Sequence, residues 1–494
     1  MGVIQRQGIK TTLINFLGAA IGAISVLFIY PLNDEIYGYA LWFYNVAFLL
    51  IPFASMGVIS LIIKFYPAFS KSGEKTNHGF LSLIISLLTG AYLIFLLLWL
   101  FFKKYILSFL EWLEMDPGKL EENEVYILVF LYILIMLFAL INHSTNQLRI
   151  VVPNIIFHLG YKIFLPLLVL IQVHYALTQS QFSFFLTLYF GVALVIMLLY
   201  LKFLGALRFG KIKRPYDGFS FKSMATFSLF GSLNSLSGTL ATRIDTVMIP
   251  FIQDMMSNGF YGKVLFMANV VEMPTRAITQ IAGPIISKAW ESNDTSEIDV
   301  IYKKASANLF LIGSFAFILL WFILDDLIML SGKPDSFPNA RTIFFYLALS
   351  KLFDMLTSVN NQIIGYSKAY KFNLIFIFIL GILNVSLNYY FINKHGIVGA
   401  AMATALSLFV YNLIKLLFIF IKFGLQPFTL STIKTAALFI LFFYLFDTVA
   451  INVSPIISII SKVIIVSLIF GILSYFLKIS DDINNIVLKF LKRQ

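Results

Sequence analysis

A few charged residues lie within long apolar stretches, some near the middle and others nearer one end, and these are the groups best placed to do chemistry. A charge inside a membrane helix costs about 2.5–3.5 kcal/mol on insertion scales, so each is a candidate functional group. Four are cations (Lys162, Arg243, Arg276 and Lys351) and three are carboxylates (Asp245, Glu272 and Asp354). The cations predict the binding of an anion such as a phosphate, and the carboxylates are candidates for structural or ion-coupling roles.

Lys162 stands apart because the first six apolar stretches offer no carboxylate at its depth. It lies about 15 Å from either membrane surface at 1.5 Å per residue, which is farther than its side chain reaches. Its partner is therefore either a carboxylate from the second half of the chain or a mobile anion such as a substrate phosphate. The sequence leaves both interpretations open.

The remaining charges include two pairs at helical spacing. Glu272 and Arg276 are four residues apart, and Lys351 and Asp354 are three apart, so each pair can share a helix face and neutralise itself. We expect either this internal pairing or a direct role in binding cargo.

Motifs of enzymes and metal sites do not occur in the sequence. There is no Walker A loop, HExxH or GxSxG, there are no cysteines, and the five histidines have no acidic cluster beside them. We expect neither an enzyme nor a bound metal or cofactor. Transport would then draw on an ion gradient, the membrane potential or the cargo gradient.

The elements that must position these charges are membrane-spanning helices. Hydrophobic residues make up 60% of the 494 and charged residues 12%, and the mean hydropathy is +0.89. The apolar blocks are about 20 residues long, the length that crosses a bilayer as a helix, and they lack the alternation of a β-barrel strand. We predict an all-α protein of about fourteen spans: 9–30, 38–63, 80–102, 125–141, 151–174, 182–204, 224–251, 260–284, 305–324, 342–364, 372–392, 397–421, 432–450 and 456–477.

The distribution of basic residues orients these spans. Loops assigned to the outside hold few cations (Lys103, Lys104, Lys119, Lys333, Arg341 and Lys394), so the positive-inside rule places both termini in the cytoplasm. The first span is expected to be retained rather than cleaved as a signal peptide. The net charge of +12 is then explained by topology and anionic lipid, without a nucleic-acid partner.

A basic segment divides the chain. We expect an N-lobe at 1–204, a cytoplasmic linker at 205–222, a C-lobe at 223–424, and two further spans at 425–494 ending in an amphipathic or frayed tail. Tyr39 precedes Pro52 and Tyr261 precedes Pro274 by 13 residues each, which indicates two lobes related as repeats. Transporters built in this way bind substrate between the repeats.

Two segments resemble a known family. Asn384-Val-Ser-Leu-Asn388 with Gly396-Ile-Val-Gly-Ala-Ala-Met-Ala-Thr404, and Arg243-Ile-Asp245 with Phe260-Tyr-Gly262 beyond it, resemble the multidrug/oligosaccharidyl-lipid/polysaccharide exporter superfamily. The similarity is to its polysaccharide branch, the O-antigen and oligosaccharide-lipid flippases.

The resemblance implies a MATE-like, V-shaped pair of six-helix lobes with two C-terminal helices. It implies a transporter of the bacterial inner membrane that moves undecaprenyl-diphosphate-linked glycans by alternating access. These glycans would be used to build lipopolysaccharide and other surface polysaccharides, and glycan polymerase or assembly proteins would be its partners. Lys162, Arg243, Arg276 and Lys351 would then bind the diphosphate. A cation-coupled multidrug exporter and a non-transporting scaffold are the alternatives.

The sequence departs from two branches of the superfamily. The drug-exporting branch carries a membrane-embedded acid in its first lobe, whereas Asp34 and Glu35 are expected in an outer loop. The peptidoglycan-precursor branch has several arginines in that lobe, and here only Lys162 lies at mid-membrane.

Overall fold

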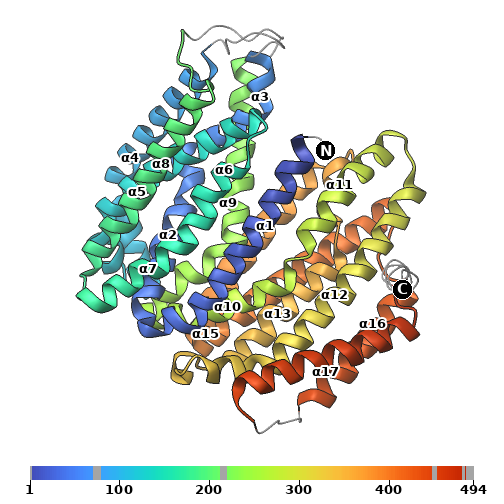
Figure 1. The fold of residues 1–494 in the computed structure, drawn as a ribbon. Helices are drawn as coiled ribbons and strands as arrows, with labels where there is room; N and C mark the ends of the chain where they lie inside the picture. The colour runs from blue at the N-terminus through green and yellow to red at the C-terminus, as the bar shows by residue number, and fades with distance from the viewer. Residues whose placement is uncertain (1–2, 70–78, 212–219, 448–452, 481–483, 485–494) are drawn as a thin grey trace. The chain divides into compact units, whose positions relative to one another are not determined.

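The computed structural model describes residues 3–69, 79–211, 220–447, 453–480 and 484. All regular structure within these ranges is helical (Figure 1). The chain divides into two compact units, Met1–Gly259 and Phe260–Gln494.

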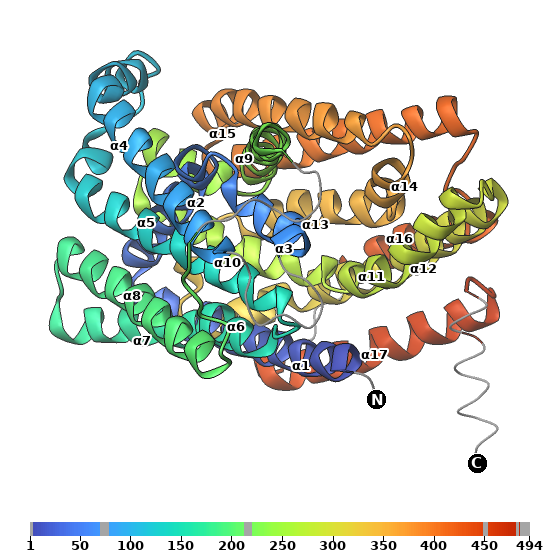
Figure 2. The ribbon, with the colours of Figure 1, turned by 90° about the horizontal axis from the view of Figure 1, so that it is seen from above.

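The first unit is built around the helix α2. Its residues Tyr39, Trp42 and Phe43 are fully buried, and α2 packs against α4, α5 and α9. Helices α7 and α8 lie side by side in Figures 1 and 2 and contact each other. The helices are α1 (Val3–Ile24), α2 (Asp34–Ser55), α3 (Leu61–Phe69), α4 (Phe80–Trp112), α5 (Gly118–Asn146), α6 (Val151–Asn154), α7 (Gly160–Tyr175), α8 (Gln179–Phe203) and α9 (Phe221–Ile252).

A close backbone approach fixes the start of α10 (Met255–Glu272) against α2. A Cβ atom at Gly38 would lie 1.7 Å from the Met255 carbonyl oxygen, and one at Gly259 would lie 2.1 Å from that of Asp34. The Asn258 amide donates to the Gly38 carbonyl at 2.8 Å. Only glycine permits this packing, because any larger side chain would overlap the neighbouring backbone.

The second unit is built around the long helix α12. This helix packs against α11, α13, α16 and α17, while α13 packs against α15. After α10 the helices are α11 (Thr275–Glu291), α12 (Thr295–Leu330), α13 (Ala340–Thr357), α14 (Asn360–Tyr366), α15 (Lys371–Phe423), α16 (Leu430–Asp447) and α17 (Pro455–Phe476).

Helix α15 contains a chain reversal. Gly396 has φ 60° and ψ −140°, which is not helical. A Cβ at Gly399 would lie 1.9 Å from the Phe391 carbonyl oxygen, although eight residues of straight helix would span about 12 Å. The 53 residues therefore form two antiparallel spans, as the sequence predicted for 372–392 and 397–421.

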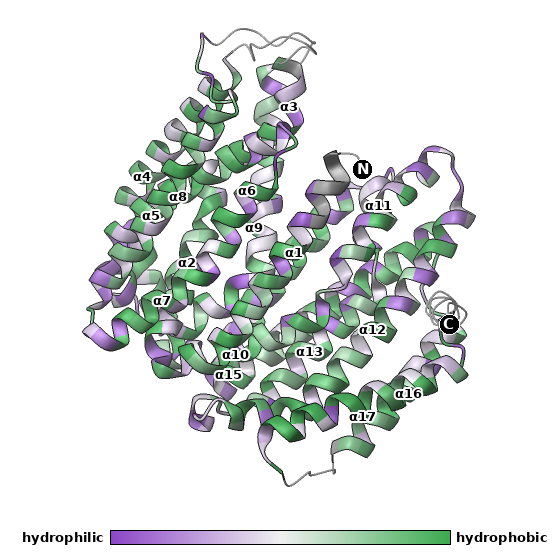
Figure 3. Ribbon diagram, viewed as in Figure 1, coloured by the Kyte–Doolittle hydropathy of each residue, from purple (hydrophilic) through white to green (hydrophobic). Residues whose placement is uncertain are grey.

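The helices have the length and composition of membrane spans. Nine pass a test of length and hydropathy among the described residues, and α13 with α14, bent by 46°, forms a tenth. Because α15 holds two spans, eleven of the fourteen expected spans fall on these helices. The other three fall on α9, on α10 with α11, and on α16. Hydrophobic residues, green in Figure 3, make up most of the helices. The chain is a multi-pass membrane protein.

The expected domain boundaries stay predictions. Residues 212–219 of the expected linker and most of the expected amphipathic tail (481–483 and 485–494) lie outside the described residues. The boundary between the two compact units falls between Gly259 and Phe260 in the chain. Helix α9 was expected in the C-lobe, but it packs against α2 in the first unit.

Candidate functional site

Arg243 on α9 is held by side chains of α2. Its guanidinium donates to the Asn45 side-chain oxygen, and the Asn45 amide donates to Thr246 Oγ1 at 2.8 Å. The guanidinium carbon lies 4.2 Å from the centre of the Phe48 ring and 5.6 Å from that of Tyr44. Cation–π contacts of this kind stabilise a positive charge that has lost part of its water.

The Tyr44 ring links Arg243 to α7, the helix that carries a second cation. It stacks on Tyr161 of α7, with centroids 5.0 Å apart and planes within 15°. The residue after Tyr161 is Lys162. Two of the four predicted cations are thus linked to one pair of half-buried tyrosine rings: Arg243 contacts Tyr44, and Lys162 follows Tyr161 in the sequence.

Lys162 packs against a glycine of α1. A Cβ at Gly18 would lie 3.1 Å from Lys162 Cδ and 3.4 Å from its Nζ. The missing side chain at Gly18 leaves room for the stem of the lysine, which is half-buried. We name Lys162, Arg243, Tyr44 and Tyr161 the cationic cluster.

Asp245 lies on a different face of α9 from Arg243. It lies two residues after Arg243 on α9, a spacing that places side chains on different helix faces. Asp245 is 3% exposed, whereas Arg243 is half-buried.

Glu272 on α10 pairs with Lys351 on α13 in the second unit. The two side chains lie 2.7 Å apart. The expected pair of Glu272 with Arg276 is wrong, because α10 ends at Glu272 and α11 begins at Thr275, so the four-residue spacing does not lie on one helix. Arg276 is exposed and makes no ion pair with any described residue.

The expected pair of Lys351 with Asp354 is also wrong as a direct contact. Asp354 instead accepts from the Asn412 amide at 3.2 Å and interacts electrostatically with Glu272, Lys415 and Lys351. Lys415 on α15 is 1% exposed. A network of two carboxylates and two lysines therefore joins α10, α13 and α15.

Two further buried lysines of this unit make polar contacts that the sequence did not predict. The first is Lys415 on α15, whose Nζ donates to the Asn361 side-chain oxygen at 2.9 Å. The second is Lys462 on α17, which pairs with Asp326 on α12 at 2.7 Å. Each lysine lies six residues inside a predicted span, so its position was a usable signal.

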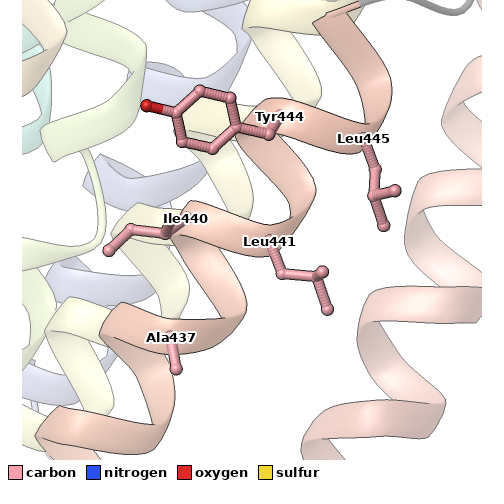
Figure 4. A pocket seen from close by; sticks show the side chains of 5 residues that line it. All are labelled: Ala437, Ile440, Leu441, Tyr444 and Leu445. Carbon is pink, nitrogen blue, oxygen red and sulfur yellow. The ribbon is translucent and has the colours of Figure 1, made fainter.

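An open apolar hollow lies along the exposed face of α16. Figure 4 shows the side chains that line it, all from this helix. They are Ala437, Ile440, Leu441, Tyr444 and Leu445. The hollow offers almost no polar group, so it suits hydrocarbon.

Solved structures share this fold. No protein-family model matches the chain, and no curated protein matches it in sequence. A structure of the lipid II flippase MurJ in an inward closed conformation is 17% identical, with a TM-score of 0.71 over 95% of this chain and 99% of that one. An inward-facing multidrug resistance MATE family transporter of the MOP superfamily is 17% identical, with a TM-score of 0.53 over 85% and 97%.

A third solved structure, the Vibrio cholerae MATE transporter VcmN, is 12% identical, with a TM-score of 0.52 over 84% of this chain and 97% of that one. The expected all-α membrane fold of the MATE type is therefore confirmed.

Proposed function

We propose that the protein is a flippase that moves a lipid-linked oligosaccharide with an anionic diphosphate from the inner to the outer leaflet of a bacterial inner membrane. The observation that carries the proposal is the cationic cluster, in which Arg243 contacts the Tyr44 ring, Tyr44 stacks on Tyr161, and Lys162 is the next residue along α7. The shared fold supports a transporter, and one protein with this fold is a lipid II flippase.

A diphosphate would use this cluster in two ways. Arg243 and Lys162 would supply charge-assisted hydrogen bonds, which are about twice as strong as neutral ones. The tyrosine hydroxyls could bond to sugar hydroxyls, because a phenol both donates and accepts. Arg243 is already oriented by Asn45, so less rotamer freedom is lost when the anion binds.

The other expected binding residues contribute differently. Lys351 is neutralised by Glu272, so its contribution to an anion is reduced, while the exposed Arg276 stays a candidate contact. We propose ion-coupling or structural roles for Asp245, Glu272 and Asp354, among which the Glu272–Lys351 contact favours a structural one.

The lipid portion of the cargo requires an apolar site. A polyprenyl chain stays in the hydrocarbon during transfer, since exposing each CH₂ to water costs about 0.8 kcal/mol. The hollow on α16 is lined by five residues whose exposed surface is almost entirely apolar. These side chains are exposed, so they would contact a polyprenyl chain as they contact lipid hydrocarbon.

We further propose that both termini lie in the cytoplasm and that glycan polymerase or assembly proteins are partners. The runner-up function is a cation-coupled multidrug exporter, which the fold shared with MATE transporters supports. A non-transporting scaffold is the third possibility.

Binding to purified protein separates these functions. We expect undecaprenyl diphosphate to raise the melting temperature more than undecaprenyl monophosphate, and Arg243→Gln to reduce that difference. The control Lys303→Gln removes a cation that pairs with Asp299 one turn away on α12. It should leave the difference in melting temperature between the two lipids unchanged. Stabilisation by a cationic dye but by neither lipid would instead favour the drug exporter, and stabilisation by none of the three would favour the scaffold.

A further inference from the structure

A single π-helical turn precedes Lys162. The segment η4 (Ile155–Leu159) lies between α6 and α7, and the Gly160 amide donates to the Ile155 carbonyl five residues back rather than to Ile156 four residues back. The π turn therefore deprives the Ile156 carbonyl of its usual helical partner. Such turns are rare, and they are frequently found at functional sites.

Tyr189 of α8 supplies the missing partner. Its hydroxyl donates to the Ile156 carbonyl oxygen at 2.8 Å. A Cβ at position 160 would lie 2.4 Å from this hydroxyl oxygen, so the glycine leaves the space that the hydroxyl occupies. The Tyr189 ring stacks face to face on Phe164, with centroids 4.5 Å apart, which restrains the ring that carries the hydroxyl.

The π turn sets where the next residues point. It adds one residue to the turn, so converting it to α-helix would rotate everything beyond it by about 100°, the angle of one residue. Tyr161 and Lys162 are the second and third residues beyond η4. Their contacts with Tyr44 and Gly18 therefore depend on this turn.

We propose that Tyr189 is a positioning residue: its hydroxyl stabilises the π turn at Ile155–Leu159 and thereby directs Lys162 toward Gly18. The positioning is a matter of geometry alone. Its consequence for transport rests on the proposed function of Lys162.

Crosslinking tests the geometry. The chain has no cysteine, so Gly18→Cys with Lys162→Cys gives one defined pair for a short bifunctional thiol reagent. We expect Tyr189→Phe to slow crosslinking by up to about fivefold, the change in the equilibrium constant that the loss of one hydrogen bond predicts. The control Tyr200→Phe, on the same helix and without a hydroxyl hydrogen bond to described residues, should leave the rate unchanged. An unchanged rate in Tyr189→Phe would overturn the proposal.

A second variant separates the hydrogen bond from packing. Gly160→Ala should also slow crosslinking, because its Cβ displaces the hydroxyl. In Gly160→Ala with Tyr189→Phe the clash is gone but the bond is still missing, so we expect crosslinking to stay slow. Recovery in this double variant would show that packing alone holds the turn and would overturn the proposal.

A transport measurement keeps the two proposals distinct. It uses Tyr189→Phe with Gly18 and Lys162 intact, and we expect transport to slow. If crosslinking slows while transport stays at the wild-type rate, the positioning role of Tyr189 stands and the transport role of Lys162 falls.

Discussion

Lys351 Nζ lies 2.7 Å from Glu272 Oε2, and this contact joins α13 to the last residue of α10. The break at Met273 and Pro274 separates Glu272 from Arg276, which the sequence suggested as its partner. A helix end therefore decides which of two nearby cations neutralises this carboxylate.

Reversing both charges of the Glu272–Lys351 pair should restore the stability that either single charge reversal loses. We expect Glu272→Lys to destabilise the protein by about 1–3 kcal/mol, below the ~3–5 kcal/mol of a fully buried pair because a third of the Glu272 side chain is exposed. Glu272→Lys with Lys351→Glu should recover folded yield and melting temperature. Well-folded single variants that lose transport, unrescued in the double variant, would indicate that these residues contact cargo instead.

Lys462 and Asp326 should behave as a buried ion pair that stabilises the packing of α17 against α12. Their side chains are only 9% and 14% exposed. We expect Lys462→Ala to lower stability by about 3–5 kcal/mol, since it leaves Asp326 buried and uncompensated. Lys462→Met with Asp326→Leu should be close to wild type in thermal unfolding. Arg341→Gln breaks the exposed pair with Asp325 and should cost less than about 1 kcal/mol. Equal effects of the two single changes would contradict this account.

The reversal inside α15 should require glycine at 399. Gly399→Ala places a Cβ 1.9 Å from a backbone oxygen that cannot move aside, so we expect little monodisperse protein by size-exclusion chromatography. Gly471→Ala is the control, because nothing lies within 4 Å of its Cβ position. Normal folding of Gly399→Ala would mean that the two spans do not pack this closely.

The sequence predicted the all-α membrane fold and most span limits, because hydropathy and length alone determine which segments can cross a bilayer. It also predicted the turn at Gly396. It did not predict that α10 ends at Glu272, or that Asn45, Tyr44 and Tyr161 surround Arg243. Those contacts join residues up to about 200 positions apart, and spacing along one helix carries no information about them.

Single cysteines test the proposed orientation. A cysteine at Lys211, exposed at the end of the described part of the basic segment, should react with an impermeant thiol reagent only after the cells are permeabilised. A cysteine at Lys394, next to the reversal at Gly396, should react in intact cells. Labelling of position 211 from outside would reverse the topology and the direction of transport.

The protein is proposed to move a diphosphate-linked glycan that its cationic cluster binds. Transfer of fluorescent undecaprenyl-diphosphate oligosaccharide in proteoliposomes tests this proposal most directly. We expect the wild-type protein to transfer this lipid. Lys162→Arg should retain part of the rate, whereas Lys162→Gln and Arg243→Gln should each lose about tenfold or more, as expected when a charged hydrogen bond worth about 1.5–3 kcal/mol is removed. Transfer by Lys162→Gln and Arg243→Gln at the wild-type rate, at equal reconstitution, would contradict the account.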